Sequence, residues 1–376
     1  MEEIDWVRSE FPIVERMIYL DMAYGNPLAK SVKFAMEEYM EAFQRNGVSV
    51  ERARAYKILE DVRAKFAALV NAKASEVAFI KNTSEGLNIA ARGIKFEEGE
   101  NIVLNELEHP NNTYCWRRLE AEGIVVRIVP QREGRVDIQE LVSAIDHDTR
   151  VVAVASTTNM GFRFDLEELG RVCEENGALL VVDAVQSLGI EPLDVEAAGV
   201  DILSASAHKG LLGPHGIGFF YCSEEILDQV DPPYVAGISY EESSSGEALL
   251  KGTAGKFEYG NYNYLGGHAM IPALGILEKV RIENIKGHCF GLANKFRGGL
   301  CKMGVEVMDS PLPSENSHIV TFNVEGMNVK EVREKLIEKR VMLSAHYGDL
   351  RASFALFNNK EDVEGALEVL RKVICN

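Results

Sequence analysis

The chain has 376 residues, which is more than one ordinary hydrophobic core holds and predicts two domains. Hydrophobic residues make up 46% of it and charged residues 26%, a balance typical of soluble globular proteins. Asp and Glu outnumber Lys and Arg so strongly that the formal net charge is −18. A charge of this sign argues against a nucleic acid or an anionic membrane as partner.

Cysteine usage and the N-terminus bear on location. The six cysteines are scattered and form no CxxC pair, so zinc-knuckle and redox-pair functions are disfavoured and a reduced, cytoplasmic protein is predicted. The first 20 residues are acidic and contain no long apolar run, so we expect neither a signal peptide nor a membrane span. His208 and His215 flank a Gly-Pro turn without further ligands, so no metal site is expected.

In chain order, the first half alternates apolar runs with helical segments. The runs are continuous rather than alternating, which predicts strands covered on both faces. They occupy residues 76–80, 101–106, 125–129, 151–156, 179–185 and 202–206. Residues 165–177 are typical of the helices between them, with one apolar face and a terminal Gly. This alternation predicts an α/β fold with a mainly parallel sheet and helices on both faces. Residues 216–222 follow too closely for a crossover and should run antiparallel.

The second half has a different pattern. Residues 237–260 are rich in Gly and Ser, and we place a domain change after them. A strand is predicted at 317–326 and helices at 328–340 and 361–375, which suggests a smaller α+β domain. We therefore predict a large domain at 15–255 and a small domain made of 1–14 and 256–376.

An acid and a lysine follow neighbouring buried strands. Asp183 ends "LLVVD", and Lys209 follows the next strand in "SASAHKG". Alone, Asp183 would be a helix cap and Lys209 a solvated turn lysine. Together they lie at the edge of the sheet where ligands bind. A lysine that forms a Schiff base and an Asp that pairs a pyridinium nitrogen are what pyridoxal 5′-phosphate requires.

A phosphate site and a ring partner are also predicted. Thr83 and Ser84 open an apolar helix whose first N–H groups suit a phosphate, although a plain capping box is the favoured explanation of this motif by itself. Ser206 and His208 stand beside the lysine and add donors. His109 follows another strand, where a flat imidazole can stack on a pyridine ring and move protons, unless it is simply exposed.

These motifs resemble the class V aminotransferase family of pyridoxal-phosphate enzymes. The resemblance spans "MIYLDMAYGNPL" to "RASFALFNN" and is strongest in "VVDAVQS" and "SASAHKGLLGPHGIGFFY". It favours the branch that holds cysteine desulfurases, selenocysteine lyases and isopenicillin N epimerase-like proteins. It implies the pyridoxal-phosphate-dependent transferase fold of type I.

The resemblance also implies roles for individual residues. Lys209 would be the Schiff-base lysine, Asp183 the partner of the pyridine nitrogen and His109 the stacking histidine. Gln186 and Asn159 would lie near the ring hydroxyl, and Arg351 would bind the substrate α-carboxylate. The phosphate would be held by Thr83, Ser84, Ser206 and His208. A homodimer is implied as well, with Asn261 of one subunit completing the partner's phosphate site in place of the usual Thr.

One departure from the family bears on the reaction. A desulfurase needs a thiolate shortly before the substrate arginine, but "MLSAHYGDLRAS" has no cysteine. Ser344, His346 and Tyr347 stand there instead, and Cys301 and Cys375 are far away in sequence. Persulfide chemistry is therefore disfavoured.

Several reactions on an amino acid remain open. We rank an aminotransferase that uses an amino acid and a keto acid first, because Lys209 alone can move the α-proton. A β-lyase is second, and an epimerase with His346 or Tyr347 as the second acid/base is third. A scaffold without activity is the non-enzyme alternative. Tyr24 and Arg163 are candidates for the substrate pocket, although a surface ion pair is the preferred explanation of Arg163.

Overall fold

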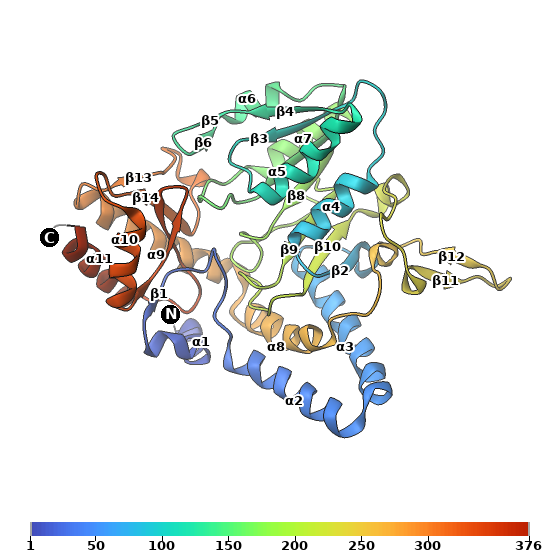
Figure 1. The fold of residues 1–376 in the computed structure, drawn as a ribbon, viewed down its shortest axis with the longest axis horizontal. Coiled ribbons are helices and arrows are strands. Elements are labelled where there is room, and N and C mark those ends of the chain that lie inside the picture. The colour runs from blue at the N-terminus through green and yellow to red at the C-terminus, as the bar shows by residue number, and fades with distance from the viewer. Residues whose placement is uncertain (1, 375–376) are drawn as a thin grey trace.

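The computed structural model describes residues 2–374 and shows a large α/β unit and a small α+β unit (Figure 1). Cys375 lies outside the described residues. The large unit is built on a seven-stranded sheet of order β2-β10-β9-β8-β7-β3-β4. Its strands are β2 (Val77–Ile80), β3 (Asn101–Asn105), β4 (Val125–Val129), β7 (Thr149–Ala155), β8 (Leu179–Asp183), β9 (Ile202–Ser206) and β10 (Gly218–Cys222).

The strand directions agree with the sequence prediction. The pairs from β9 through β8, β7 and β3 to β4 are all parallel. β10 is antiparallel to both β9 and β2, as the short connection after residue 206 predicts. The prediction was wrong for β4 in one respect. β4 is an edge strand whose Val125 is 55% exposed, so its apolar run does not mean that both faces are covered.

Helices cover both faces of the sheet because successive strand residues point to opposite sides. Val182 faces a core shared with α3 (Val48–Leu69), α7 (Leu166–Asn176) and α8 (Tyr264–Val280). Val181 faces a second core, shared with α4 (Thr83–Gly93) and α5 (Pro110–Arg117). Helix α7 begins and ends where the sequence predicts. Asp165 Oδ1 accepts a hydrogen bond from Glu168 N at 3.2 Å at its start, and Gly177, with φ +74°, ends it.

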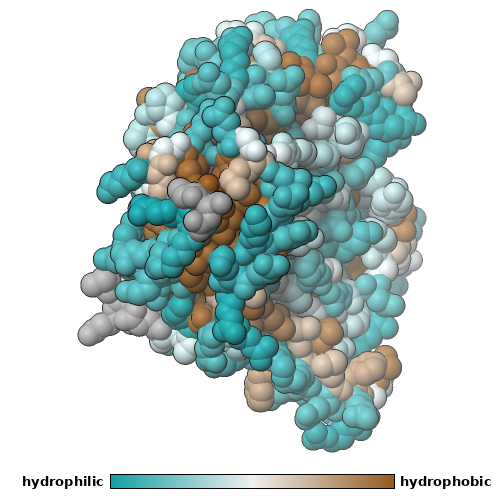
Figure 2. Space-filling view, turned by 60° about the vertical axis from the view of Figure 1, so that its left-hand side comes forward, coloured by the Kyte–Doolittle hydropathy of each residue, from teal (hydrophilic) through white to brown (hydrophobic). Residues whose placement is uncertain are grey.

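The small unit has an antiparallel sheet of order β13-β14-β17-β16. Its strands are β13 (Glu306–Val307), β14 (Ile319–Asn323), β16 (Ser344–His346) and β17 (Asp349–Ser353). Its helices are α9 (Ile282–Lys302), α10 (Val329–Glu338) and α11 (Lys360–Ile374). This confirms the α+β character predicted for the C-terminal part. Figure 2 shows that the face on this side is mostly hydrophilic, with a narrow apolar strip.

The N-terminal segment reaches the small unit. α1 (Glu2–Glu10) is followed by β1 (Ile18–Tyr19), which pairs in parallel with β15 (Val341–Met342). α2 (Lys30–Asn46) then leads into α3 and the large unit. The stretch 237–260 contains the hairpin β11 (Tyr240–Glu242) and β12 (Ala248–Leu250), and Phe257 after it is buried against the large sheet. The exact domain boundary stays a prediction.

Two further hairpin strands, β5 (Gln131–Arg132) and β6 (Arg135–Val136), precede the short helix α6 (Ile138–Ser143). None of the helices in the described part of the chain is long and apolar enough to cross a membrane.

Candidate active site

A cavity of about 970 Å³ lies between the carboxyl ends of the large-sheet strands and the small unit. Ten of the eleven residues predicted from the sequence line it: Thr83, Ser84, His109, Asn159, Asp183, Gln186, Ser206, His208, Lys209 and Arg351. Asn261 lines a separate cavity of about 210 Å³ beside it. Asn261 is predicted to contact the phosphate site of a partner subunit, so its location within a single chain does not test that prediction.

Lys209 and Asp183 share the centre of the cavity because β8 and β9 are parallel neighbours. Burial lowers the pKa of the Lys209 amine to about 8, although the Asp183 charge opposes this shift. Burial raises the pKa of the Asp183 carboxyl to about 6, against a hydrogen bond from Val185 N at 3.0 Å. The site therefore brings an easily deprotonated amine and a buried carboxylate together, as a nucleophilic lysine and its charged partner require.

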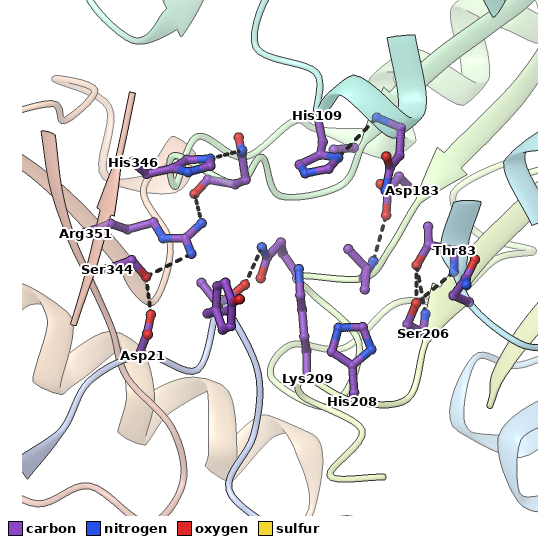
Figure 3. Close-up of a pocket in the computed structure, with 18 of the residues that line it drawn as sticks. Asp21, Thr83, His109, Asp183, Ser206, His208, Lys209, Ser344, His346 and Arg351 are labelled. Carbon is purple, nitrogen blue, oxygen red and sulfur yellow. Dashed lines mark hydrogen bonds between the residues drawn. The ribbon is translucent and has the colours of Figure 1, made fainter. Parts of the chain in front are cut away.

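Thr83 and Ser206 form the other end of the cavity (Figure 3). Ser206 Oγ accepts a hydrogen bond from Thr83 N at 2.7 Å, and Thr83 Oγ1 accepts one from Ser206 N at 2.9 Å. The cap of α4 is Asn82, whose Oδ1 accepts from Glu85 N at 3.0 Å, so the capping box on Thr83 or Ser84 is wrong. Because Asn82 caps the helix, the hydroxyl of Thr83 is free to join the helix to β9.

His109 comes directly before α5 and faces the same cavity. Its Nδ1 accepts a hydrogen bond from Asn111 N at 3.2 Å, so the ring proton is on Nε2. Burial lowers the pKa of His109, and the charges of Lys209 and Arg351 add to this effect. The ring is therefore neutral near pH 7, which suits stacking on an aromatic cofactor.

Glu108 lies behind His109 and is buried. Its carboxylate accepts hydrogen bonds from Asn105 Nδ2 at 2.7 Å, Ala155 N at 2.9 Å and Asn112 Nδ2 at 2.6 Å. Burial nevertheless raises the pKa of Glu108 to about 7. This carboxyl fixes the backbone turn that presents His109.

The remaining predicted cofactor residues have partners within the chain. The His208 ring stacks on His215 with centroids 4.3 Å apart, and burial lowers the pKa of His208 to about 4. Gln186 Nε2 donates to Ala23 O at 3.1 Å, which ties the loop after β8 to the N-terminal segment.

Arg351 is held at the small-unit end of the cavity. Its Nη1 donates to Asn159 O at 2.9 Å and its Nη2 to Ser344 Oγ at 3.2 Å. The Ser344 hydroxyl in turn donates to the carboxylate of Asp21. Arg351 Nε is buried and has no hydrogen-bond partner among the described residues. An oriented guanidinium with an unused N–H is suited to bind a carboxylate.

Of the other candidates for the substrate pocket, some line the cavity and others do not. Tyr24 lines the cavity and is 74% exposed, whereas Arg163 does not line it. Arg163 instead pairs with Glu191 at 2.7 Å, and because the Glu191 side chain is only 6% exposed, this ion pair is largely buried rather than at the surface as expected. His346 lines the cavity, but Tyr347 next to it does not and is 65% exposed.

Sequence reasoning missed Asp21, which lines the cavity and contacts Ser344. Its only signal was an acid directly after the short apolar run "MIYL". Lys330 and Arg333 of α10 (Val329–Glu338) also line the cavity and were missed. In the sequence they lie on the polar face of an amphipathic helix, which is normally exposed to solvent. The other lining side chains not predicted include Lys81, Asn82, Asn111, Thr157 and Glu334.

No cysteine lines the cavity within the described residues. Cys115, Cys173, Cys222 and Cys289 are buried elsewhere, and Cys301 is exposed on α9. The same part of the chain holds no group of three or more His, Cys, Asp or Glu side chains that could bind a metal ion.

Comparison with known proteins identifies the family. The sequence profile described as aminotransferase class-V matches residues 18–365. The chain belongs to the class-V aminotransferase family. A "probable cysteine desulfurase" of Methanothermobacter thermautotrophicus is 32% identical over 98% of this chain and 97% of its own length. A protein of the same name from Pyrococcus abyssi is 31% identical over 98% of this chain and 97% of its own.

Solved structures agree with this assignment. The apo structure of a cysteine desulfurase from Thermococcus onnurineus NA1 has a TM-score of 0.91 and is 29% identical, covering 98% of this chain and 97% of that one. The fold is therefore the type I fold of pyridoxal-phosphate enzymes, as predicted. The class-V protein is a pyridoxal-phosphate-dependent enzyme. The expected aminotransferase activity is not confirmed, and the lyase alternative fits the named relatives better.

The residues in the cavity fit pyridoxal phosphate. Lys209 supplies an amine with a lowered pKa, and Asp183 supplies a buried carboxylate in the same cavity. The N-terminus of α4 opens onto the end marked by Thr83, where a phosphate is favoured by the helix dipole. The guanidinium of Arg351 lines the opposite end, where it suits an amino-acid carboxylate.

Proposed function

We propose that this protein is a pyridoxal-phosphate-dependent β-lyase that cleaves the Cβ–S bond of cysteine or a closely related S-substituted amino acid. The observation that carries the proposal is the set of side chains that line the cavity. They include an amine, a buried carboxylate and a guanidinium suited to a carboxylate, but no cysteine lines the cavity among the described residues. Relatives named cysteine desulfurases at 31–32% identity support a sulfur-containing substrate.

Named residues would hold the cofactor and the substrate. Lys209 would bind the aldehyde carbon, Asp183 the ring nitrogen and His109 the ring face. Thr83, Ser84, Ser206 and His208 would surround the phosphate, with Gln186 and Asn159 near the ring hydroxyl. Arg351 would bind the α-carboxylate through charge-assisted hydrogen bonds. When bound, pyridoxal phosphate supplies an electron sink for the bonds at the substrate α-carbon.

The chain's own residues account for the remaining steps. Lys209 removes the α-proton, because its amine has a lowered pKa and is unprotonated in part near pH 7. The Cβ–S bond then breaks and its electron pair leaves with sulfur, which takes a proton and departs as hydrogen sulfide. The released 2-aminoacrylate takes up water and yields pyruvate and ammonia. Cysteine and water thus balance pyruvate, ammonia and hydrogen sulfide, and no protein thiol takes part.

Product analysis of the purified holoenzyme with L-cysteine tests this reaction. A β-lyase forms sulfide and pyruvate in equal amounts, and the double variant Cys301→Ser, Cys375→Ser keeps the full rate. A persulfide-forming desulfurase would instead yield alanine and lose activity in that variant. Exchange of the amino group with an added keto acid, without sulfide, would establish the aminotransferase.

We also propose that the working form is a cytoplasmic homodimer. Apolar side chains exposed on α2 and at the start of α3 support a covered surface there: Phe34, Met40, Phe43, Val48 and Val50. Free cysteines among the described residues agree with a reducing compartment. In such a dimer Asn261 would contact the partner's phosphate site. Light scattering on the eluted protein tests the oligomer, and a monomer at micromolar concentration would contradict it.

A further inference from the structure

His346 occupies a fixed position at the small-unit end of the cavity. It ends β16, where it pairs with Asp349 of β17, and the two strands are joined by Tyr347 and Gly348. Both turn residues have positive φ, 51° and 96°, as in the tight two-residue hairpins that match strand twist. The ring of His346 packs on Tyr347 with centroids 4.2 Å apart. The backbone and one ring face of His346 are therefore fixed.

The tautomer of His346 follows from its partner. Asn159 Nδ2 lies 2.8 Å from His346 Nε2. An amide nitrogen can only donate, so Nε2 accepts and the ring proton is on Nδ1. No hydrogen bond to Nδ1 is found among the described residues. The ring thus carries an uncommitted N–H donor on a residue that lines the cavity.

Asn159 also links His346 to the predicted carboxylate site. Its backbone oxygen accepts from Arg351 Nη1 at 2.9 Å, while its side chain donates to His346. Figure 3 shows His346 and Arg351 together at this end, far from Thr83 and Ser206. A substrate whose carboxylate rests on Arg351 has its β-substituent only three bonds from that carboxyl carbon. The imidazole is therefore a neighbour of the leaving group.

The charge state of the ring defines what it can do there. Burial lowers the pKa of His346 to about 4, and the positive charges of Arg351 and Lys209 and the nearby His109 contribute. The acid that faces Arg351 is Asp21, which already accepts the Ser344 hydroxyl. A neutral imidazole is a poor proton donor but a good hydrogen-bond donor, the role of electrophilic histidines that stabilise a developing anion.

We propose that His346 donates a hydrogen bond from Nδ1 to the departing sulfur, and that Asn159 is the positioning residue that fixes the required tautomer. This assignment rests on the β-lyase function proposed above. The Cβ–S electron pair moves to sulfur, Nδ1–H stabilises the thiolate without giving up its proton, and water supplies the proton of the product thiol. A hydrogen-bond donor thus stands in the hairpin segment where a desulfurase needs a sulfur-accepting thiol.

Two substrates with different leaving groups separate this role from a structural one. L-Cysteine releases a basic thiolate that needs stabilisation, whereas β-chloro-L-alanine releases chloride, which does not. His346→Phe should lower kcat for pyruvate formation from L-cysteine on the order of 10²-fold, as loss of an anion-stabilising donor does. The kcat with β-chloro-L-alanine should be nearly unchanged. Tyr347→Phe, on the same hairpin but outside the cavity, should change neither rate.

A second variant keeps the test independent of how His346→Phe folds. Asn159→Ala frees the ring to change tautomer, so the ratio of the two kcat values should shift in the same direction by a smaller factor. Equal losses with both substrates would overturn the role of His346. Failure of the wild-type enzyme to release pyruvate from either substrate would instead overturn the β-lyase function itself.

Discussion

Thr83 and Ser206, 123 residues apart in the chain, are joined by reciprocal hydrogen bonds between backbone N–H groups and side-chain hydroxyls. A further contact joins the two hydroxyl oxygens at 2.8 Å. These bonds fasten the first turn of α4 to the end of β9, the strand that precedes Lys209. The proposed phosphate end and the proposed reactive amine are therefore held in one rigid unit.

Ser206→Ala should weaken binding of pyridoxal phosphate. The change removes a hydroxyl that is proposed to contact the phosphate, and the loss of a hydrogen bond to a charged group costs about 1.5–3 kcal/mol, or roughly 12- to 150-fold in Kd. Titration of the apoprotein with the cofactor, followed by fluorescence quenching, measures this directly. Ser243→Ala on the exposed β11–β12 hairpin is the control. An unchanged Kd would remove Ser206 from the phosphate site.

Gly86→Ala should displace α4 from the sheet. A Cβ at this position would lie 2.2 Å from Ser204 Oγ and 2.9 Å from Ser204 Cβ, so the helix or the strand must move. Overpacking of this kind costs about 1–3 kcal/mol of unfolding free energy and should weaken cofactor binding as well. Gly287→Ala in α9 is a matched control, because its Cβ would meet nothing within 4 Å. The control should gain up to about 1 kcal/mol from helix propensity. Equal effects of the two variants in urea unfolding would contradict this prediction.

The pH dependence of cofactor uptake should reveal the lowered pKa of Lys209. Only the neutral amine reacts with an aldehyde, so the uptake rate of the apoprotein should rise tenfold per pH unit and level off above about 8. An ordinary lysine would level off near pH 10.4. Asp183 raises the pKa of Lys209, so Asp183→Asn should move the midpoint to lower pH. Stopped-flow absorbance gives the profile, and a plateau only above pH 10 would refute the assignment.

The sequence predicts the parts of the site that depend on strand ends. Asp183 and Lys209 follow continuous apolar runs, so their place at one sheet edge follows from parallel pairing. The short link before β10 likewise predicts its antiparallel direction. These features need only local pattern and topology rules.

Other parts of the site depend on contacts that no local pattern encodes. Asp21 and Ser344 are 323 residues apart and meet only because β1 pairs with β15 beside the cavity. Asn82 rather than Thr83 caps α4, and Thr83 instead bonds Ser206, 123 residues away in the chain. The edge position of β4 follows from strand order, which its apolar composition does not reveal.

Glu108→Gln should make the stability of the apoprotein less dependent on pH. Burial raises the pKa of Glu108 from 4.5 to about 7 in the folded chain, so between these values the folded state holds a proton that the unfolded chain has lost. The stability from this group is therefore fully present below about pH 4.5 and is lost as the pH rises through about 7. A glutamine cannot ionise, so this fall in unfolding free energy should disappear in the variant. The shallower fall due to Asp183, whose pKa is raised to about 6, should remain.

Urea unfolding from pH 4.5 to 8 measures the slope of unfolding free energy against pH. Glu98→Gln, at an exposed loop residue, controls for the lost charge. If Glu108→Gln and the wild type show the same slope, Glu108 ionises as it does in the unfolded chain.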